Sequence, residues 1–107
     1  MNMILRDTHN SNQIVAGLNG DFDSLNITEV REELEQTIMN SAADNVVLDL
    51  SNVDFIDSSG IGAIVFLYKR LHGSQRHLEL IGAKGQPKQL LELLRISQAI
   101  PVTWAAE

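Results

Sequence analysis

A chain of 107 residues without cysteine is long enough for one hydrophobic core, and it excludes disulfides, thiolate chemistry and cysteine-ligated zinc. Fourteen acidic against eight basic residues give a net charge of −6, which argues against nucleic acid and anionic membranes as partners. The longest apolar stretch, 61–68, is far shorter than the ~20 residues of a membrane span, and the N-terminus does not resemble a signal peptide. We therefore expect a single cytoplasmic domain, 1–107, without membrane insertion.

The first part of the chain predicts a β-hairpin followed by a helix. Residues 3–7 and 13–18 have the pattern of two strands, separated by turn-forming residues at 8–12. Residues 19–23 break the second strand. A helical period then starts near Leu25, and its core-facing positions are Ile27, Val30, Leu34 and Ile38. The N-cap of this helix stays open among three residues, Asp23, Ser24 and Asn26.

The rest of the chain alternates strands and helices. Residues 46–50 are almost entirely apolar, as expected for a central strand that helices cover. A second helix follows from about Ser58 to Leu71, then a strand at 78–81, a third helix beginning at Pro87 and a short strand at 101–104. We expect the third helix to bury a stripe of leucines, Leu90, Leu91, Leu94 and Leu93. The order β-β-α-β-α-β-α-β predicts an α/β fold whose mixed, mostly parallel sheet has four to five strands and three or more helices.

Two hydroxyl groups lie where the central strand turns into the second helix. Asp57 is expected to cap this helix, so that Ser58 and Ser59 fall in its first turn. Helix N-termini favour a carboxylate or a phosphate, because their first N–H groups have no internal partner and carry the positive end of the dipole. An ordinary N-cap is the alternative interpretation. However, the helix is apolar on nearly all sides, so we expect some apolar surface beside the serines to stay exposed, as in a protein-binding face.

Other chemistries have little support in the sequence. The run Gly60-Ile61-Gly62 lacks the third glycine of a dinucleotide-binding motif, because that position is Val65, and no P-loop lysine is present. The three histidines lack triad support and metal-ligand spacing: His9, His72 and His77. Four acids near turns are a weak candidate for a cation site: Asp21, Asp23, Asp54 and Asp57. We expect no cofactor, no metal ion and no catalytic residue.

Residues 46–62, VVLDLSNVDFIDSSGIG, resemble the signature of the STAS domain, specifically that of anti-sigma factor antagonists in bacterial partner-switching systems. Residues 20–23 are similar to the Gly-Glu-Leu-Asp turn before the first helix of that family, and the loop and helix around Pro87 also fit. Gln86 stands where the family often has a serine. The resemblance implies the STAS fold and a regulatory protein that is not an enzyme.

In that family the unphosphorylated protein binds an anti-sigma factor that is also a serine kinase, of the GHKL type, and a PP2C-type phosphatase reverses the phosphorylation. The match implies phosphorylation of Ser58, with Ser59 as runner-up, in surroundings formed by Asp23, Asp57, Ser59 and Gly60. It implies a partner-binding surface of Asp21, Ile61, Gly62, Val65, Phe66 and Lys69. The alternative is a STAS subunit of an ABC-type transport complex, which binds its ATPase permanently and is never phosphorylated.

Overall fold

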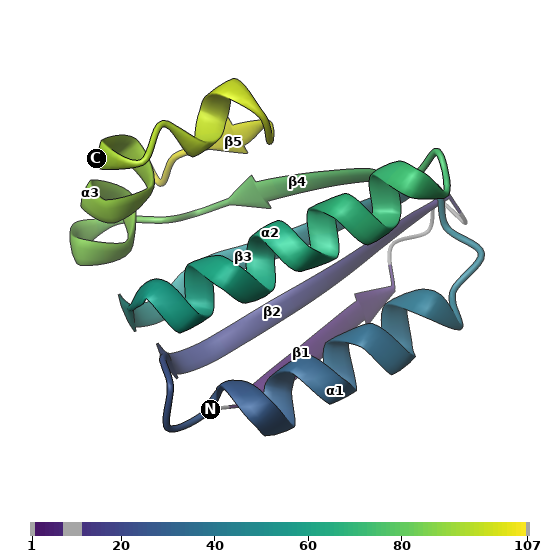
Figure 1. Ribbon diagram of the computed structural model, residues 1–107, viewed down its shortest axis with the longest axis horizontal. Coiled ribbons are helices and arrows are strands. Elements are labelled where there is room, and N and C mark those ends of the chain that lie inside the picture. Colours follow the sequence, from purple (N-terminus) through teal and green to yellow (C-terminus); the bar gives the residue numbers. More distant parts are fainter. Residues whose placement is uncertain (1, 8–11, 107) are drawn as a thin grey trace.

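A computed structural model describes the backbone of residues 2–7 and 12–106, and the side chains from residue 12 to 106. His9 and most of the turn expected at 8–12 lie outside the described residues. The elements follow the chain as β1 (Asn2–Asp7), β2 (Gln13–Phe22), α1 (Ile27–Met39), β3 (Asn45–Ile56), α2 (Ser58–Gly73), β4 (His77–Ile81), α3 (Gly85–Leu93), the 3-10 turn η1 (Ile96–Gln98) and β5 (Val102–Thr103) (Figure 1).

The strands form one five-stranded sheet in the order β1-β2-β3-β4-β5. β1 pairs antiparallel with β2, and the remaining neighbours are parallel. The parallel strands are joined by helices, as right-handed crossovers require. The expected α/β fold with a mixed, mostly parallel sheet is therefore confirmed.

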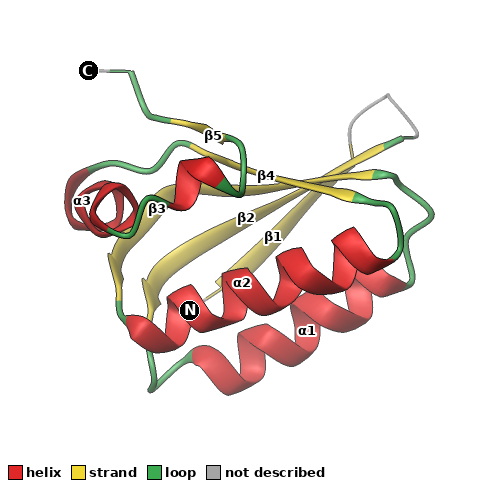
Figure 2. Cartoon of the chain, turned by 45° about the horizontal axis from the view of Figure 1, so that its top comes forward, coloured by secondary structure: helices red, strands yellow, loops and turns green. Residues whose placement is uncertain are grey.

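Two helices, α1 and α2, lie side by side on one face of the sheet (Figure 2). Alternate residues of the central strands point into the layer between sheet and helices, where Leu18, Leu48 and Leu80 are fully buried. They belong to one core together with residues from both helices, including Ile38 of α1 and Leu71 of α2. Within the part of the chain that is described, no helix has the length and apolar character needed to cross a membrane.

The break expected at residues 19–23 is wrong, because β2 continues to Phe22. The end of β2 pairs with the end of β3, which itself runs to Ile56 instead of stopping at Leu50. Gly20 has a φ of 101°, and the register between the two strands shifts on either side of it. Residues typical of a turn thus form irregularities inside two long strands, since pairing between the strands outweighs local preference.

The third helix differs from expectation in two respects. It begins at Gly85, so Pro87 is its third residue rather than its first. Pro87 and Leu91 are buried, whereas Leu93 and Leu94 are 78% and 48% exposed, so the prediction of a wide leucine stripe is wrong for both. The helix ends at this point and the chain turns away, so the core is filled by residues further along the sequence.

Candidate functional site

Asp57 caps α2 and also ties it to a distant loop. Its Oδ1 accepts hydrogen bonds from the backbone N–H groups of Ser59 (2.9 Å) and Gly60 (3.1 Å), which confirms the expected N-cap. Its Oδ2 accepts from the backbone N–H of Ser24 (3.0 Å), in the loop between β2 and α1. One carboxylate therefore holds together two loops that are 33 residues apart in the chain.

These contacts stabilise the charged form of Asp57. Partial burial raises the pKa of the carboxyl group, but the N–H groups of Ser24, Gly60 and Ser59 outweigh it, and the pKa lies below its usual 3.8. Asp57 is thus negatively charged at neutral pH, and two amide donors of the first helical turn are already occupied.

The two glycines that follow the serines differ in their surroundings. A Cβ atom added to Gly60 would lie 2.3 Å from the carbonyl oxygen of Phe22 and 3.0 Å from Cγ2 of Ile56. Gly60 therefore allows α2 to begin in direct contact with the ends of β2 and β3. A Cβ added to Gly62 would meet nothing within 4 Å, and Gly62 is exposed.

Ser58 is the first residue of α2 and is exposed, whereas Ser59 is half-buried. Asp23 lies in the adjoining loop, where its Oδ1 accepts from the backbone N–H of Leu25 (3.2 Å) and from Nδ2 of Asn26 (2.8 Å). Asn26 occupies the N-cap position of α1 but makes no side-chain capping bond. Asp23 thus organises the loop that Asp57 holds, and the structure brings the expected surroundings of Ser58 to one end of the molecule.

The remaining acids of this end do not form a metal site. Asp21 is exposed and pairs in register with Phe55 of β3, and Asp54 is exposed as well. Among the described residues, no three His, Asp or Glu side chains gather closely enough to hold a metal ion.

A stripe of exposed and half-buried residues runs along α2 from Ser58. Steps of three or four residues place side chains on the same face of a helix. Four of the expected partner-binding residues follow this rule: Ile61, Gly62, Val65 and Lys69. Gly62 and Lys69 are exposed, and Ile61 and Val65 are half-buried. We call the surface formed by Ser58 and these four residues the α2 stripe.

Phe66, which was also expected to bind a partner, lies on the side of α2 that faces α1. The guanidinium carbon of Arg31 is 4.3 Å from the centre of its ring, and that of Arg70 is 5.9 Å away. Phe66 is half-buried beneath these cations, so it contributes to packing between the helices.

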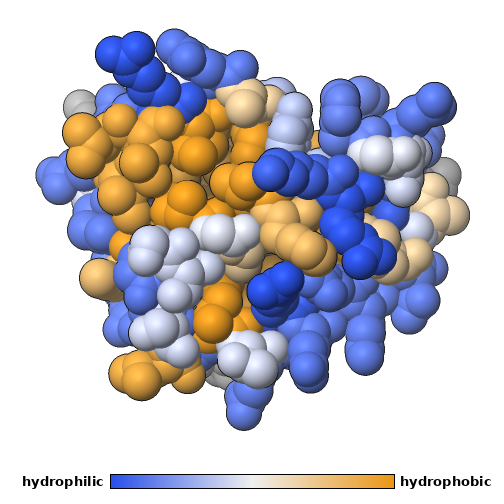
Figure 3. Space-filling model, viewed as in Figure 1, coloured by the Kyte–Doolittle hydropathy of each residue, from blue (hydrophilic) through white to orange (hydrophobic). Residues whose placement is uncertain are grey.

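Large apolar side chains are exposed around the same end of the molecule. They come from the loop before α1, the end of β3 and the end of α3, and they are Leu25, Phe55, Leu93 and Leu94. The space-filling view shows apolar surface gathered over α3 and extending toward α2 (Figure 3). The sequence contained a signal for the exposure of Leu93 and Leu94, because four leucines within five residues cannot all lie on one face of a short helix.

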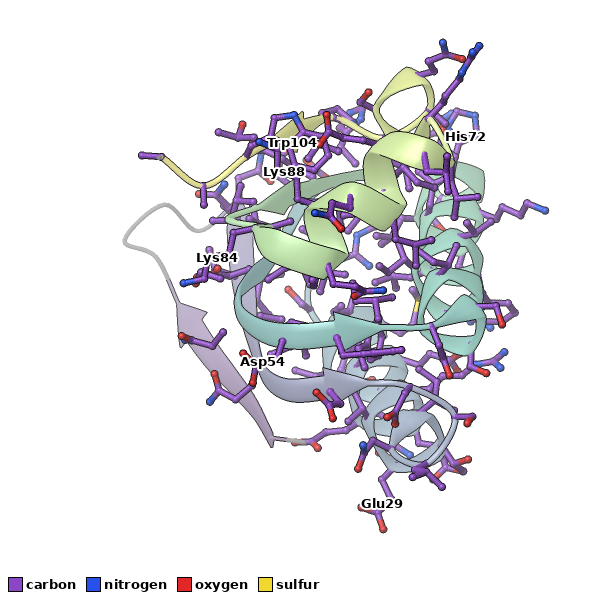
Figure 4. The ribbon with its side chains drawn as sticks, turned by 90° about the vertical axis from the view of Figure 1, so that its left-hand side faces the viewer. Glu29, Asp54, His72, Lys84, Lys88 and Trp104 are labelled. Atoms are coloured by element: carbon purple, nitrogen blue, oxygen red, sulfur yellow. The ribbon has the colours of Figure 1, made fainter. Side chains whose placement is uncertain are left out.

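Gln86, in the first turn of α3, was not expected to contribute to the site. Its side-chain amide forms two hydrogen bonds with the backbone of Ile56, the residue directly before Asp57. Figure 4 looks onto this end of the molecule and shows Lys88 of α3 beside Trp104, with Nζ 5.9 Å from the ring centre. In the same view, Glu29 points outward from α1.

A shallow cavity of about 270 Å³ lies at the opposite end of the sheet, where β2, β3 and β4 begin. It is lined by residues such as Gln13, Asn45 and His77, and none of the residues around Ser58 contributes to it. This cavity is therefore separate from the turn that carries Ser58.

Comparison with known proteins shows which family this chain resembles over nearly its whole length. The family model described as STAS domain matches residues 5–105. An anti-sigma-B factor antagonist from Listeria monocytogenes is 31% identical over 99 residues, covering 91% of this chain and 82% of that protein.

Two solved structures share the fold. An anti-sigma factor antagonist from Mycobacterium paratuberculosis superposes with a TM-score of 0.85 at 17% identity, covering 95% of this chain and 84% of that one. The phosphorylated form of the Bacillus cell fate determinant SpoIIAA gives a TM-score of 0.72 at 17% identity, covering 99% of this chain and 93% of that one.

Proposed function

Because this chain belongs to the STAS domain family, we propose that it is an anti-sigma factor antagonist whose binding is switched off by phosphorylation of Ser58. The observation that carries the proposal is the position of Ser58: it is exposed, it starts the α2 stripe, and it follows a capping carboxylate. In this role the protein regulates transcription in the cytoplasm by binding, not by catalysis.

The proposed partner is an anti-sigma factor that is also a serine kinase of the GHKL type. Its contact surface on this chain comprises the α2 stripe together with Asp21 in the neighbouring strand. The stripe combines apolar groups with a glycine that has open space around it, so another chain can approach the backbone of α2 closely. A PP2C-type phosphatase would return the protein to its binding form.

Phosphorylation at Ser58 would add about −1.5 to −2 charges at neutral pH. A helix N-terminus normally accommodates such a group, so the fold is expected to persist. Here, however, Asp57 already accepts hydrogen bonds from Ser59 and Gly60, and Asp23 adds a further carboxylate nearby. The phosphate would therefore remain largely uncompensated in a buried contact, at a cost of about 2–5 kcal/mol in binding.

The first test is phosphosite mapping of the protein isolated from its own cells under several growth conditions. A phosphate on Ser58 that appears and disappears is expected. The second test uses the kinase that co-purifies with the Ser58→Ala variant, and measures binding by titration calorimetry. Ser58→Ala is expected to bind, and Ser58→Asp to bind at least about 30-fold more weakly, as the lower end of that energy range requires.

Ser74→Asp is the matched control, because Ser74 lies at the opposite end of α2 and receives the same charge. It is expected to bind like the wild type. Equal binding by Ser58→Ala and Ser58→Asp would refute the switch. A chain that is never phosphorylated and co-purifies with an ABC-type ATPase would instead support the transport-complex subunit.

A further inference from the structure

The side chain of Gln86 joins α3 to the end of β3 through a pair of hydrogen bonds. Its Oε1 accepts from the backbone N–H of Ile56 (2.9 Å), and its Nε2 donates to the carbonyl oxygen of the same residue (2.8 Å). The two residues are 30 positions apart in the chain. A primary amide that pairs with both backbone groups of one residue makes the contacts that a neighbouring strand would make.

Ile56 needs such a partner because β4 ends early. The pairing between β3 and β4 stops at Asp49 and Ile81, and the chain then turns at Gly82, whose φ is 78°. On its other side, Ile56 still pairs with Phe22 of β2. Backbone groups left without a partner in a folded protein are unfavourable, so the amide of Gln86 takes the place of the missing strand.

Ile56, the residue that Gln86 holds, is directly connected to the turn that carries Ser58. Asp57 follows it in the chain and, besides capping α2, donates its own N–H to the carbonyl oxygen of Phe22 (3.3 Å). The Cγ2 atom of Ile56 also lies against Gly60, where an added Cβ would be only 3.0 Å away. A displacement of Ile56 therefore moves the cap and the packing of the first turn of α2 together.

We propose that Gln86 is a positioning residue for Ser58: it holds the backbone of Ile56 so that the Asp57–Ser58 turn is already in its binding conformation before a kinase or partner arrives. This inference rests on the proposed function of Ser58. A preformed turn avoids the entropy cost of ordering it on binding, so the expected effect is on affinity for the partner rather than on the transfer of the phosphoryl group.

The test compares Gln86→Met with Gln89→Met. Methionine keeps the length and apolar stem of glutamine but cannot replace its two strong hydrogen bonds. Gln89 is an exposed residue of the same helix, so its variant controls for the change in side-chain chemistry.

Amide hydrogen exchange, measured by NMR on the full chain, reports on the turn without any partner. In Gln86→Met, the amides of Ser59 and Gly60 are expected to exchange about tenfold faster, as loss of roughly one hydrogen bond's net contribution implies. Amides of the central strands, such as that of Leu48, are expected to keep their wild-type rates. Gln89→Met is expected to change neither group.

The functional measurement uses the kinase identified by co-purification with Ser58→Ala. For Gln86→Met, KM for this protein is expected to rise about tenfold while kcat stays within about twofold. Unchanged amide exchange rates of Ser59 and Gly60 in Gln86→Met would overturn the positioning role. Exchange that is accelerated equally in the turn and in the central strands would also overturn it, because that result indicates a general loss of stability. If no kinase modifies wild-type Ser58, the proposed function fails, whereas the exchange measurement still decides whether Gln86 orders the turn.

Discussion

The two helices on the shared face of the sheet are built differently. α1 buries a narrow stripe of Val30, Leu34 and Ile38 and presents charged residues to solvent, among them Glu29, Glu32 and Glu33. α2 also contributes to the core, but its first three turns carry no charged residue before Lys69. Folding alone explains the pattern of α1. The residues of α2 that face outward are therefore available for the proposed contact with another protein.

The N-termini of the two helices also differ. α1 begins without a side-chain capping bond, although Asp23 organises the loop before it. α2 begins at a turn held by three hydrogen bonds to Asp57 and by the close approach of Gly60 to Phe22. The helix that carries the proposed contact surface is therefore also the one whose first turn is most firmly held. The predictions below test this contrast.

The largest effect on stability is expected for Gly60→Ala. The added Cβ would lie 2.3 Å from a backbone carbonyl oxygen, and neither strand end can move without breaking its pairing. We expect a destabilisation of about 3 kcal/mol, at the upper end of what overpacking normally causes. Urea unfolding of the variant measures it. A variant as stable as the wild type would show that the start of α2 is adaptable.

Gly62→Ala is the matched substitution two residues further along α2, and it is expected to stabilise the protein. The new methyl group has open space, and alanine is favoured over glycine inside a helix by about 0.5–1 kcal/mol. The same variant should bind the proposed partner less well, because the added methyl group keeps the partner further from the backbone of α2. Urea unfolding and titration calorimetry separate these effects, and unchanged binding would place Gly62 outside the contact surface.

A smaller effect is expected for the contact that links the two helices. Arg31 lies over the ring of Phe66 at 4.3 Å, and its Nε also bonds to Glu35 of its own helix (3.2 Å). The arginine side chain is 47% exposed, so solvent weakens both interactions. A double-mutant cycle with Arg31→Ala and Phe66→Ala should give a coupling of about 0.5 kcal/mol. The cycle with Arg70→Ala, whose guanidinium is 5.9 Å away, should give less.

The last effect, which is present at neutral pH and lost in acid, concerns Asp57→Asn. Asparagine keeps one acceptor for the helix N-terminus but loses the charge and the second carboxylate oxygen that Ser24 uses. Because the pKa of Asp57 is lowered in the folded state, its carboxylate stabilises the fold at pH values above the usual 3.8. This contribution is lost as the pH falls through the folded pKa. The stability difference between wild type and variant should therefore shrink below that pH in urea titrations, and a constant difference would contradict the assignment.

The sequence by itself determined the local features that depend on neighbouring residues. The alternation of strand and helix patterns predicted the order of elements, and Asp57 at the start of an apolar helical run predicted its cap. Ser58 was placed correctly at the first turn for the same reason. These features form over a few residues, so their chemistry is visible in the chain.

Contacts between distant segments were decided only by the tertiary structure. β2 passes through Gly20, and β3 reaches Ile56, because each strand supplies the other's hydrogen bonds. The exposure of Leu93 depends on where α3 meets the sheet, and the amide of Gln86 finds Ile56 only because β4 ends before it. Such pairings join residues that are about 30 positions or more apart, and no local pattern records which partner a backbone group will find.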